Sequence, residues 1–288
     1  MRAILVAAAG LLAIGAVGSA HAADMGPPMV AKAPPPAPPE WFNWTGFYIG
    51  GNGGAAFLNS SAALTAATPF GATAATASGN GGGGFAGGQI GFNYQFDPHW
   101  VAGVEADVDW ASISGTANFC NTYTSGPFTG FTASCATSNA SIDEFNTVRG
   151  RIGYAWNNVL LYGTGGVAWH HDSVTSRLTC FAAPGFPCPA VGVPAPFFTS
   201  TPTTASATEL GWVAGAGVEV GFWQHWIVRF EYLHLQTNNF NYTTTSTGTL
   251  LGVPFAVPVA VSRNTEIDTF RLGLSYLFNF GGPVMAMR

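Results

Sequence analysis

Charged side chains are scarce in this chain of 288 residues. Asp, Glu, Lys and Arg make up 8% of the sequence, whereas an ordinary soluble domain has about a quarter. So few charges cannot cover the water-exposed surface of a protein of this size. In addition, 48% of the residues are hydrophobic. The composition therefore favours a membrane protein, and a secreted β-sandwich is the soluble alternative.

Long apolar runs are also missing after residue 22. A transmembrane helix needs about 18 to 20 consecutive apolar residues, and no later segment provides them. The other structure that spans a bilayer is a closed β-barrel, because hydrocarbon cannot satisfy the polar edge of an open sheet. We therefore predict an all-β fold, an antiparallel up-and-down transmembrane β-barrel whose eight strands are the alternating segments of residues 44–280 described below.

Sequence signatures of common cofactor and metal sites are absent as well. The chain has no H-E-x-x-H, G-K-[ST] or EF-hand pattern, and it lacks a basic run that could neutralise phosphates. We therefore predict no cofactor, no metal and no nucleic-acid partner. The four cysteines form two close pairs, Cys120 with Cys135 and Cys180 with Cys188, and neither has C-x-x-C spacing. In an oxidising compartment both pairs are expected to form disulfides.

The N-terminus carries an export signal. Arg2 precedes an apolar run that ends in small residues and the triplet Ala-His-Ala, which is typical of a signal peptide over residues 1–22. Cleavage is expected between Ala22 and Ala23. Seven prolines then fall between residues 27 and 39, a density that favours extended polyproline geometry. We interpret residues 23–43 as a periplasmic linker.

The remainder, residues 44–280, contains eight segments in which apolar and polar side chains alternate. A period of two residues is typical of strands that have one apolar and one polar face. In residues 100–113, for example, Val104, Ala106 and Val108 share one face while the intervening acids share the other. The other segments are residues 47–57, 85–96, 143–156, 159–175, 208–222, 226–235 and 267–280.

The links between these segments alternate in length. Short links fall at residues 97–99, 157–158 and 223–225, and aromatic residues flank each of them. Long links run over residues 58–83, 114–141, 176–207 and 236–266. Short periplasmic turns, long extracellular loops and aromatic girdles are typical of outer-membrane barrels. With an even number of strands both chain ends fall in the periplasm, and residues 281–288 form a short tail there.

The polar faces of the segments carry nearly balanced charges, which we assign to the lumen. Arginine forks can bind carboxylates bidentately, and an eight-stranded barrel is just wide enough for such side chains. The balance favours a structural ion-pair network over paired catalytic carboxylates, and a plugged barrel over an open pore. The predicted lumen cluster comprises Glu105, Asp107, Asp109, Arg149, Arg151, Glu219, Arg229, Glu231 and Arg271.

The run His170, His171, Asp172, Ser173 raises the alternative of a nucleophile or a metal site. Adjacent strand residues point to opposite faces, so the two histidines cannot ligate one ion without distortion. We predict that the chain is not an enzyme. Lipid hydrolysis is the catalytic alternative, and loss of lipid modification in His171→Ala and Ser173→Ala variants would support it.

Two motifs carry a family resemblance: W-T-G-F-Y-I-G-G-N-G at residues 44–53 and F-R-L-G-L-S-Y-L-F-N-F at residues 270–280. The chain resembles the small outer-membrane β-barrel proteins of alphaproteobacteria, a group similar to the opacity proteins and the transmembrane domain of OmpA. The resemblance implies an abundant protein of the outer membrane, surrounded by its lipid, with antigenic surface loops. It also implies that the barrel-assembly machinery reads a C-terminal aromatic, here Phe280.

The resemblance leaves several functions open. We expect a non-enzymatic barrel that contributes to envelope structure and presents extracellular loops. Because some relatives are porins and others bind haem, the alternatives are a narrow porin for small solutes and a surface protein that binds haem or a host molecule.

Overall fold

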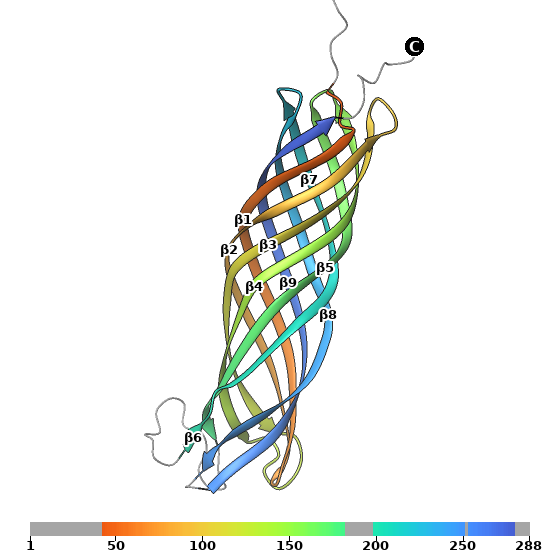
Figure 1. Ribbon diagram of the computed structural model, residues 1–288. Helices are drawn as coiled ribbons and strands as arrows, with labels where there is room; N and C mark the ends of the chain where they lie inside the picture. Colours follow the sequence, from red (N-terminus) through yellow and green to blue (C-terminus); the bar gives the residue numbers. More distant parts are fainter. Residues whose placement is uncertain (1–41, 182–197, 251–252, 280–288) are drawn as a thin grey trace, which may run out of the picture. The chain divides into compact units, whose positions relative to one another are not determined.

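The computed structural model describes residues 42–181, 198–250 and 253–279 (Figure 1). Several predictions fall outside these ranges: the signal peptide with Ala22 and Ala23, nearly all of the linker, Cys188, and Phe280 with the tail 281–288. They stay predictions. None of the described residues lies in a helix that is long and apolar enough to cross a membrane.

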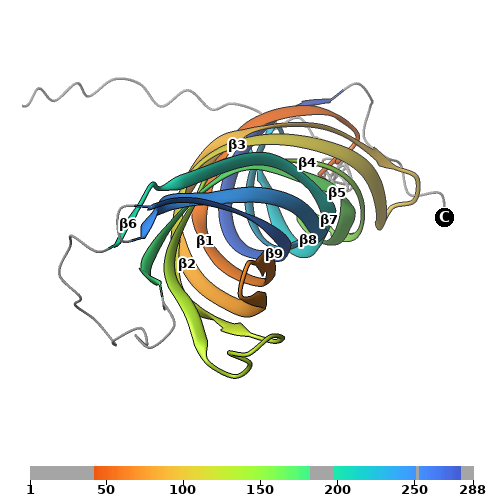
Figure 2. The ribbon, with the colours of Figure 1, turned by 90° about the horizontal axis from the view of Figure 1, so that it is seen from below.

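The described residues form nine antiparallel strands. β1 to β5 pair in chain order, β5 pairs with β7, β7 pairs with β8, and β9 pairs with both β8 and β1, so eight strands close into a ring around a common interior (Figure 2). The three-residue β6 lies outside this ring and pairs with the end of β8. The prediction of an all-β up-and-down fold is confirmed. The strands are β1 (Gly46–Thr68), β2 (Gly71–Gln95), β3 (Trp100–Tyr123), β4 (Thr132–Trp156), β5 (Val159–Phe181), β6 (Phe198–Ser200), β7 (Thr203–Phe222), β8 (Trp226–Leu250) and β9 (Val253–Asn279).

The strands are much longer than predicted, and most of the predicted long loops are wrong. β1 and β2 pair without interruption from Gly46 opposite Asn93 to Thr68 opposite Gly71, so residues 58–83 form a hairpin. The link 114–141 is likewise strand apart from residues 124–131, and β8 and β9 take up nearly all of 236–266. Ala, Thr, Ser and Gly are common in loops, but a continuous backbone ladder satisfies their polar groups equally well. Of the link 176–207, residues 182–197 lie outside the described ranges.

The short links lie where they were predicted, at residues 97–99, 157–158 and 223–225. Two of them share one arrangement: His99 stacks on Tyr154, and His225 stacks on Tyr276. A tryptophan that follows each histidine packs edge-on against the same tyrosine. Exposed rings therefore gather at this end of the ring, which we call the short-turn end.

Large apolar side chains cover only part of the outer face of the ring. On β3 they run from Trp100 to Trp110, and Val104 between them is 60% exposed. That length matches the roughly 9 to 11 residues with which a tilted strand crosses a bilayer. Beyond this apolar belt the outward positions become small or polar, as at Ala256 and Ala260 on β9. The strands thus continue past the belt as long hairpins, at what we call the hairpin end.

Candidate functional site

The inward side chains are arranged in layers along the strands. On β8 the inward-facing side chains are, in order, Ile227, then Arg229 and Glu231, then Leu233 and Leu235. The apolar layer near the short turns comprises Trp44, Tyr48, Val101, Ala155, Leu160, Tyr162, Ile227 and Leu277. The second apolar layer comprises Ala56, Leu58, Phe85, Ile113, Ile142, Phe145, Ala168, Val213, Leu233, Leu235 and Ile267. Charged side chains occupy the space between these two layers.

This charged layer contains every residue of the predicted lumen cluster. Each of the nine side chains is at most 6% exposed, and they come from β3, β4, β7, β8 and β9. The members are Glu105, Asp107, Asp109, Arg149, Arg151, Glu219, Arg229, Glu231 and Arg271. Two-residue alternation places them on the inner face because an unpaired charge on the lipid-facing side would be costly.

Arg149 joins three carboxylates from two sides of the ring. Its Nη2 atom lies 2.8 Å from Asp107 Oδ2 and also contacts Glu105, both on the neighbouring β3. Its Nη1 atom lies 2.9 Å from Glu231 Oε1 on β8, a strand that does not pair with β4. The guanidinium therefore spans the interior instead of linking two adjacent strands.

Two further arginines bridge the ring in the same way. Arg229 on β8 binds Glu219 on adjacent β7, with Nη2 2.6 Å from Oε1, and the same nitrogen contacts Glu105 on β3. Arg151 on β4 reaches Glu219 as well, with Nη2 2.7 Å from Oε2. Glu105 and Glu219 are thus each shared by arginines from different strands, which is the fork geometry that favours guanidinium over ammonium.

Arg271 completes the charged layer with longer contacts. Its nitrogens lie 3.2 Å from Asp109, 3.4 Å from Asp107 and 3.6 Å from Glu231. Its guanidinium carbon also lies 5.4 Å from the ring centre of Phe85, which belongs to the second apolar layer. The charged layer is therefore one connected network in contact with apolar side chains.

Neutral polar groups that the sequence analysis missed extend this network. Tyr162 donates a hydrogen bond to Glu231 (2.7 Å), Thr147 donates one to Asp107 (2.6 Å), and Tyr48 donates one to Glu105. Arg151 also lies over the ring of Tyr162, 4.0 Å from its centre. Alternation alone could have placed these residues inside, but a hydroxyl carries no charge pattern that marks it as a partner.

A second, smaller ionic cluster lies nearer the hairpin end. His170, Asp172 and Glu209 are buried, and one potential ligand atom from each lies within 4.8 Å of the others. The guanidinium of Arg263 contacts Asp172 and lies 3.5 Å from Glu209. Because this cation already pairs with both carboxylates, we assign no metal to the cluster. Glu209 and Arg263 were not singled out from the sequence, and Arg263 was placed in a loop.

The two histidines lie on opposite faces of β5, as alternation requires. His171 points outward, and its Nδ1 atom lies 3.3 Å from the hydroxyl of Thr208 on β7. His170 points inward toward Glu209. The four residues His170 to Ser173 therefore do not converge on one catalytic or metal-binding site.

One of the two predicted disulfides is confirmed. Cys120 on β3 and Cys135 on β4 occupy paired positions and are bonded to each other near the end of their hairpin. The pairing of Cys180 with Cys188 stays a prediction, because Cys188 lies outside the described residues.

Comparison with known proteins identifies the family. A family model described as an outer membrane protein beta-barrel domain matches residues 9–278. The chain belongs to this family. It is an outer-membrane protein, and the resemblance to the alphaproteobacterial barrels is confirmed. The 31 kDa outer-membrane immunogenic proteins of Brucella melitensis biotype 1 and Brucella suis biovar 1 are each 27% identical to it over 267 residues, which cover 90% of this chain and 94% of theirs.

Solved structures of outer-membrane proteins overlap with the chain more loosely. OprG from Pseudomonas aeruginosa has a TM-score of 0.40 and 14% identity, over 82% of this chain and 97% of OprG. The outer membrane protease OmpT from Escherichia coli has a TM-score of 0.39 and 10% identity, over 82% and 98%. At these scores neither structure carries an argument about the function of this family member.

Proposed function

We propose that this chain is a non-enzymatic barrel whose interior is closed to solutes, and that it contributes to envelope structure while presenting its hairpin end at the cell surface. One observation carries the proposal: the charged layer crosses the ring. Arg149, Arg151 and Arg229 each contact carboxylates on strands that do not neighbour their own. A hydrated solute would have to break several of these ion pairs in order to pass.

The layers on either side of the charges support a sealed interior. Leu160 and Ile227 on the short-turn side and Phe145 and Leu233 on the hairpin side are at most 2% exposed. The interior of an eight-stranded ring is just wide enough for side chains to fill it. Water would therefore meet apolar packing before and after the charged layer.

Swelling of proteoliposomes tests the closed interior against the narrow-porin alternative. Vesicles that contain the folded protein are diluted into isosmotic arabinose, and we expect them to swell no faster than protein-free vesicles. Vesicles with a general porin serve as the positive control. Swelling that exceeds the protein-free rate and increases with the amount of folded protein would refute the proposal.

The hairpin end supplies the surface-exposed part of the proposal. Residues 124–131 connect β3 to β4 well beyond the apolar belt, and the disulfide between Cys120 and Cys135 lies beside them. Short turns face the periplasm in barrels of this kind, which would put the hairpins outside the cell. The names of the Brucella relatives describe them as immunogenic, which is consistent with exposure.

Epitope insertion tests this orientation directly. A tag inserted within residues 124–131 should be labelled by antibody on intact cells, whereas the same tag within residues 223–225 should be labelled only after the outer membrane is permeabilised. The opposite pattern would invert the proposed orientation.

Assembly and lipid contacts complete the proposal. The apolar belt would contact outer-membrane lipid, and the barrel-assembly machinery would read a C-terminal aromatic residue, Phe280 in the sequence. Phe280→Ala should lower the amount of folded, heat-modifiable protein in the outer membrane, and an unchanged amount would argue against this signal. Phe270→Ala, on the outward face of β9, is the control for loss of a lipid-facing ring.

A further inference from the structure

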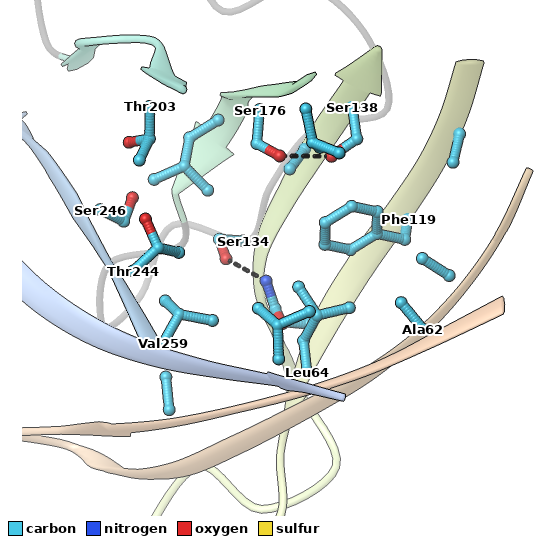
Figure 3. Close-up of a pocket in the computed structure, with 18 of the residues that line it drawn as sticks. Ala62, Leu64, Phe119, Ser134, Ser138, Ser176, Thr203, Thr244, Ser246 and Val259 are labelled. Carbon is cyan, nitrogen blue, oxygen red and sulfur yellow. Dashed lines mark hydrogen bonds between the residues drawn. The ribbon is translucent and has the colours of Figure 1, made fainter. Parts of the chain in front are cut away.

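Inside the ring, at its hairpin end, lies a partly open cavity of about 150 Å³, which we call the hairpin chamber (Figure 3). It lies beyond the cluster of His170, Asp172 and Glu209, and Arg263 of that cluster is part of its wall. Strands from all sides of the ring contribute to the lining. The chamber is therefore separate from the charged layer.

Apolar side chains dominate the wall of the hairpin chamber. The larger ones are Leu58 and Leu64 on β1, Phe119 on β3, Val174 and Leu178 on β5, and Phe255, Val257, Val259 and Val261 on β9. Outward positions on the same stretches are small or polar, such as Asn59 and Ser61 on β1. The alternation is thus the inverse of that in the apolar belt, where charges face inward.

Some of the polar groups in the wall are engaged with one another. Asn121 donates a hydrogen bond to Ser134 (3.0 Å), and the hydroxyls of Ser138 and Ser176 lie 2.5 Å apart, as the dashed lines in Figure 3 show. Arg263 is bound to carboxylates. Most of the remaining wall is apolar, so a charged occupant would lose more hydrogen bonds to water than the scattered hydroxyls of the wall could replace.

We propose that the hairpin chamber binds one small, uncharged apolar molecule, of about the size of a single aromatic ring. An apolar protein cavity of roughly 150 Å³ is known to stay dry and to accept benzene. Drug-sized ligands occupy pockets of roughly 300–1,000 Å³, so haem does not fit this chamber. Its lining residues also include no histidine or cysteine that could ligate haem iron.

Methyl NMR with toluene as the probe tests the proposal. The protein, with 13C-labelled methyl groups of Leu and Val, is purified in lipid nanodiscs and titrated with toluene. Methyl signals of chamber residues such as Leu64 and Val259 should shift and saturate. Signals of belt residues such as Val104 and Leu272 report partitioning into lipid and should shift in proportion to toluene without saturating.

A matched pair of variants locates the site. Ala62 lines the chamber, whereas its neighbour Ala63 faces outward. Ala62→Phe should fill the chamber and weaken saturable binding at least about tenfold, while Ala63→Phe should leave it unchanged. Leu64→Asn adds a polar amide to the wall without filling the space, and it should also weaken saturable binding of toluene. This variant keeps the test informative if Ala62→Phe does not fold.

The outcomes are distinct. Saturable shifts at chamber methyls that Ala62→Phe or Leu64→Asn removes and Ala63→Phe retains would support the proposal. Linear shifts throughout, or saturable shifts that none of the chamber variants changes, would overturn it. A conducting barrel would contradict the proposed function without affecting this result. The conductance test measures whether the charged layer is closed, whereas the NMR titration measures binding in the hairpin chamber.

Discussion

Replacing Arg149 by methionine should strongly destabilise the barrel. This side chain is 1% exposed and contacts Glu105, Asp107 and Glu231. Methionine keeps much of the apolar stem but removes the guanidinium. Three buried carboxylates would then lose a shared cation.

The expected magnitude follows from that geometry. Removing one partner of a buried ion pair costs roughly 3–5 kcal/mol, because the other charge is left uncompensated. Since about 1.4 kcal/mol corresponds to a factor of ten, the unfolding equilibrium constant should rise by about two to three and a half orders of magnitude. Arg151 and Arg229 also contact Glu105, so that acid retains part of its compensation and the lower half of the range is expected.

Urea-induced unfolding in lipid vesicles measures this change, with folded protein quantified by its gel mobility without boiling. Free energies are extrapolated linearly to zero urea. Arg177→Met is the matched control, because Arg177 is exposed on the outward face of β5. Arg177→Met should change the free energy of unfolding by no more than about 0.5 kcal/mol, as most surface substitutions do.

A double variant sharpens the test. Wild type has five acids and four arginines in the charged layer, and Arg149→Met with Glu231→Met leaves four acids and three arginines, which is the same excess of one acid. It should therefore be less destabilised than the sum of the two single variants. Equal effects of Arg149→Met and Arg177→Met, or strict additivity in the double variant, would refute the reasoning.

Three further predictions address other layers of the molecule. Val104→Arg, in the middle of the apolar belt on β3, should make folding into lipid less favourable by about 2–4 kcal/mol, and a destabilisation below about 0.5 kcal/mol in the urea assay would mean that this face does not meet hydrocarbon. Gly87→Ala should cost about 1–3 kcal/mol in the same assay, because a Cβ atom there would collide with the Asp109 side chain and the Val108 carbonyl; an unaffected midpoint would contradict this. Cys120→Ser should make residues 124–131 more sensitive to protease while the folded barrel persists, and equal cleavage rates with and without the disulfide would show that the strand pairing alone holds the hairpin.

The part of the fold inside the apolar belt could be predicted from sequence because its alternation has strong contrast. On β3, valines and tryptophan face outward while Glu105, Asp107 and Asp109 face inward. The short turns also could be located, since aromatic residues flank each one. Strong contrast between faces fixes both the phase and the bounds of a strand.

The hairpin end could not be predicted in the same way because its contrast is weak and inverted. Residues 58–83 contain mostly Ala, Thr, Ser and Gly, which do not distinguish an inner face from an outer one. On β9, Phe255, Val257, Val259 and Val261 face inward, whereas Pro254 and Pro258 face outward. Prolines suggest a loop, but here they alternate on the outward face of β9 within its pairing with β8.

The charged layer shows where sequence reasoning ends within the site. Alternation placed Arg149 and Glu231 on inner faces, but it could not show that they meet, because their strands are not neighbours. Contacts across the ring depend on the relative heights of distant strands, which no local pattern encodes. For the same reason the link of Arg263 to Asp172 and Glu209 could not be found.

Single-channel recording in a planar bilayer tests the central claim most directly, because it measures ion flow through one folded molecule. The cross-ring network of four arginines and five carboxylates predicts no steady current at any voltage that the bilayer tolerates. A reproducible ohmic conductance that scales with salt concentration, from protein shown to be folded by its gel mobility, would contradict a sealed interior.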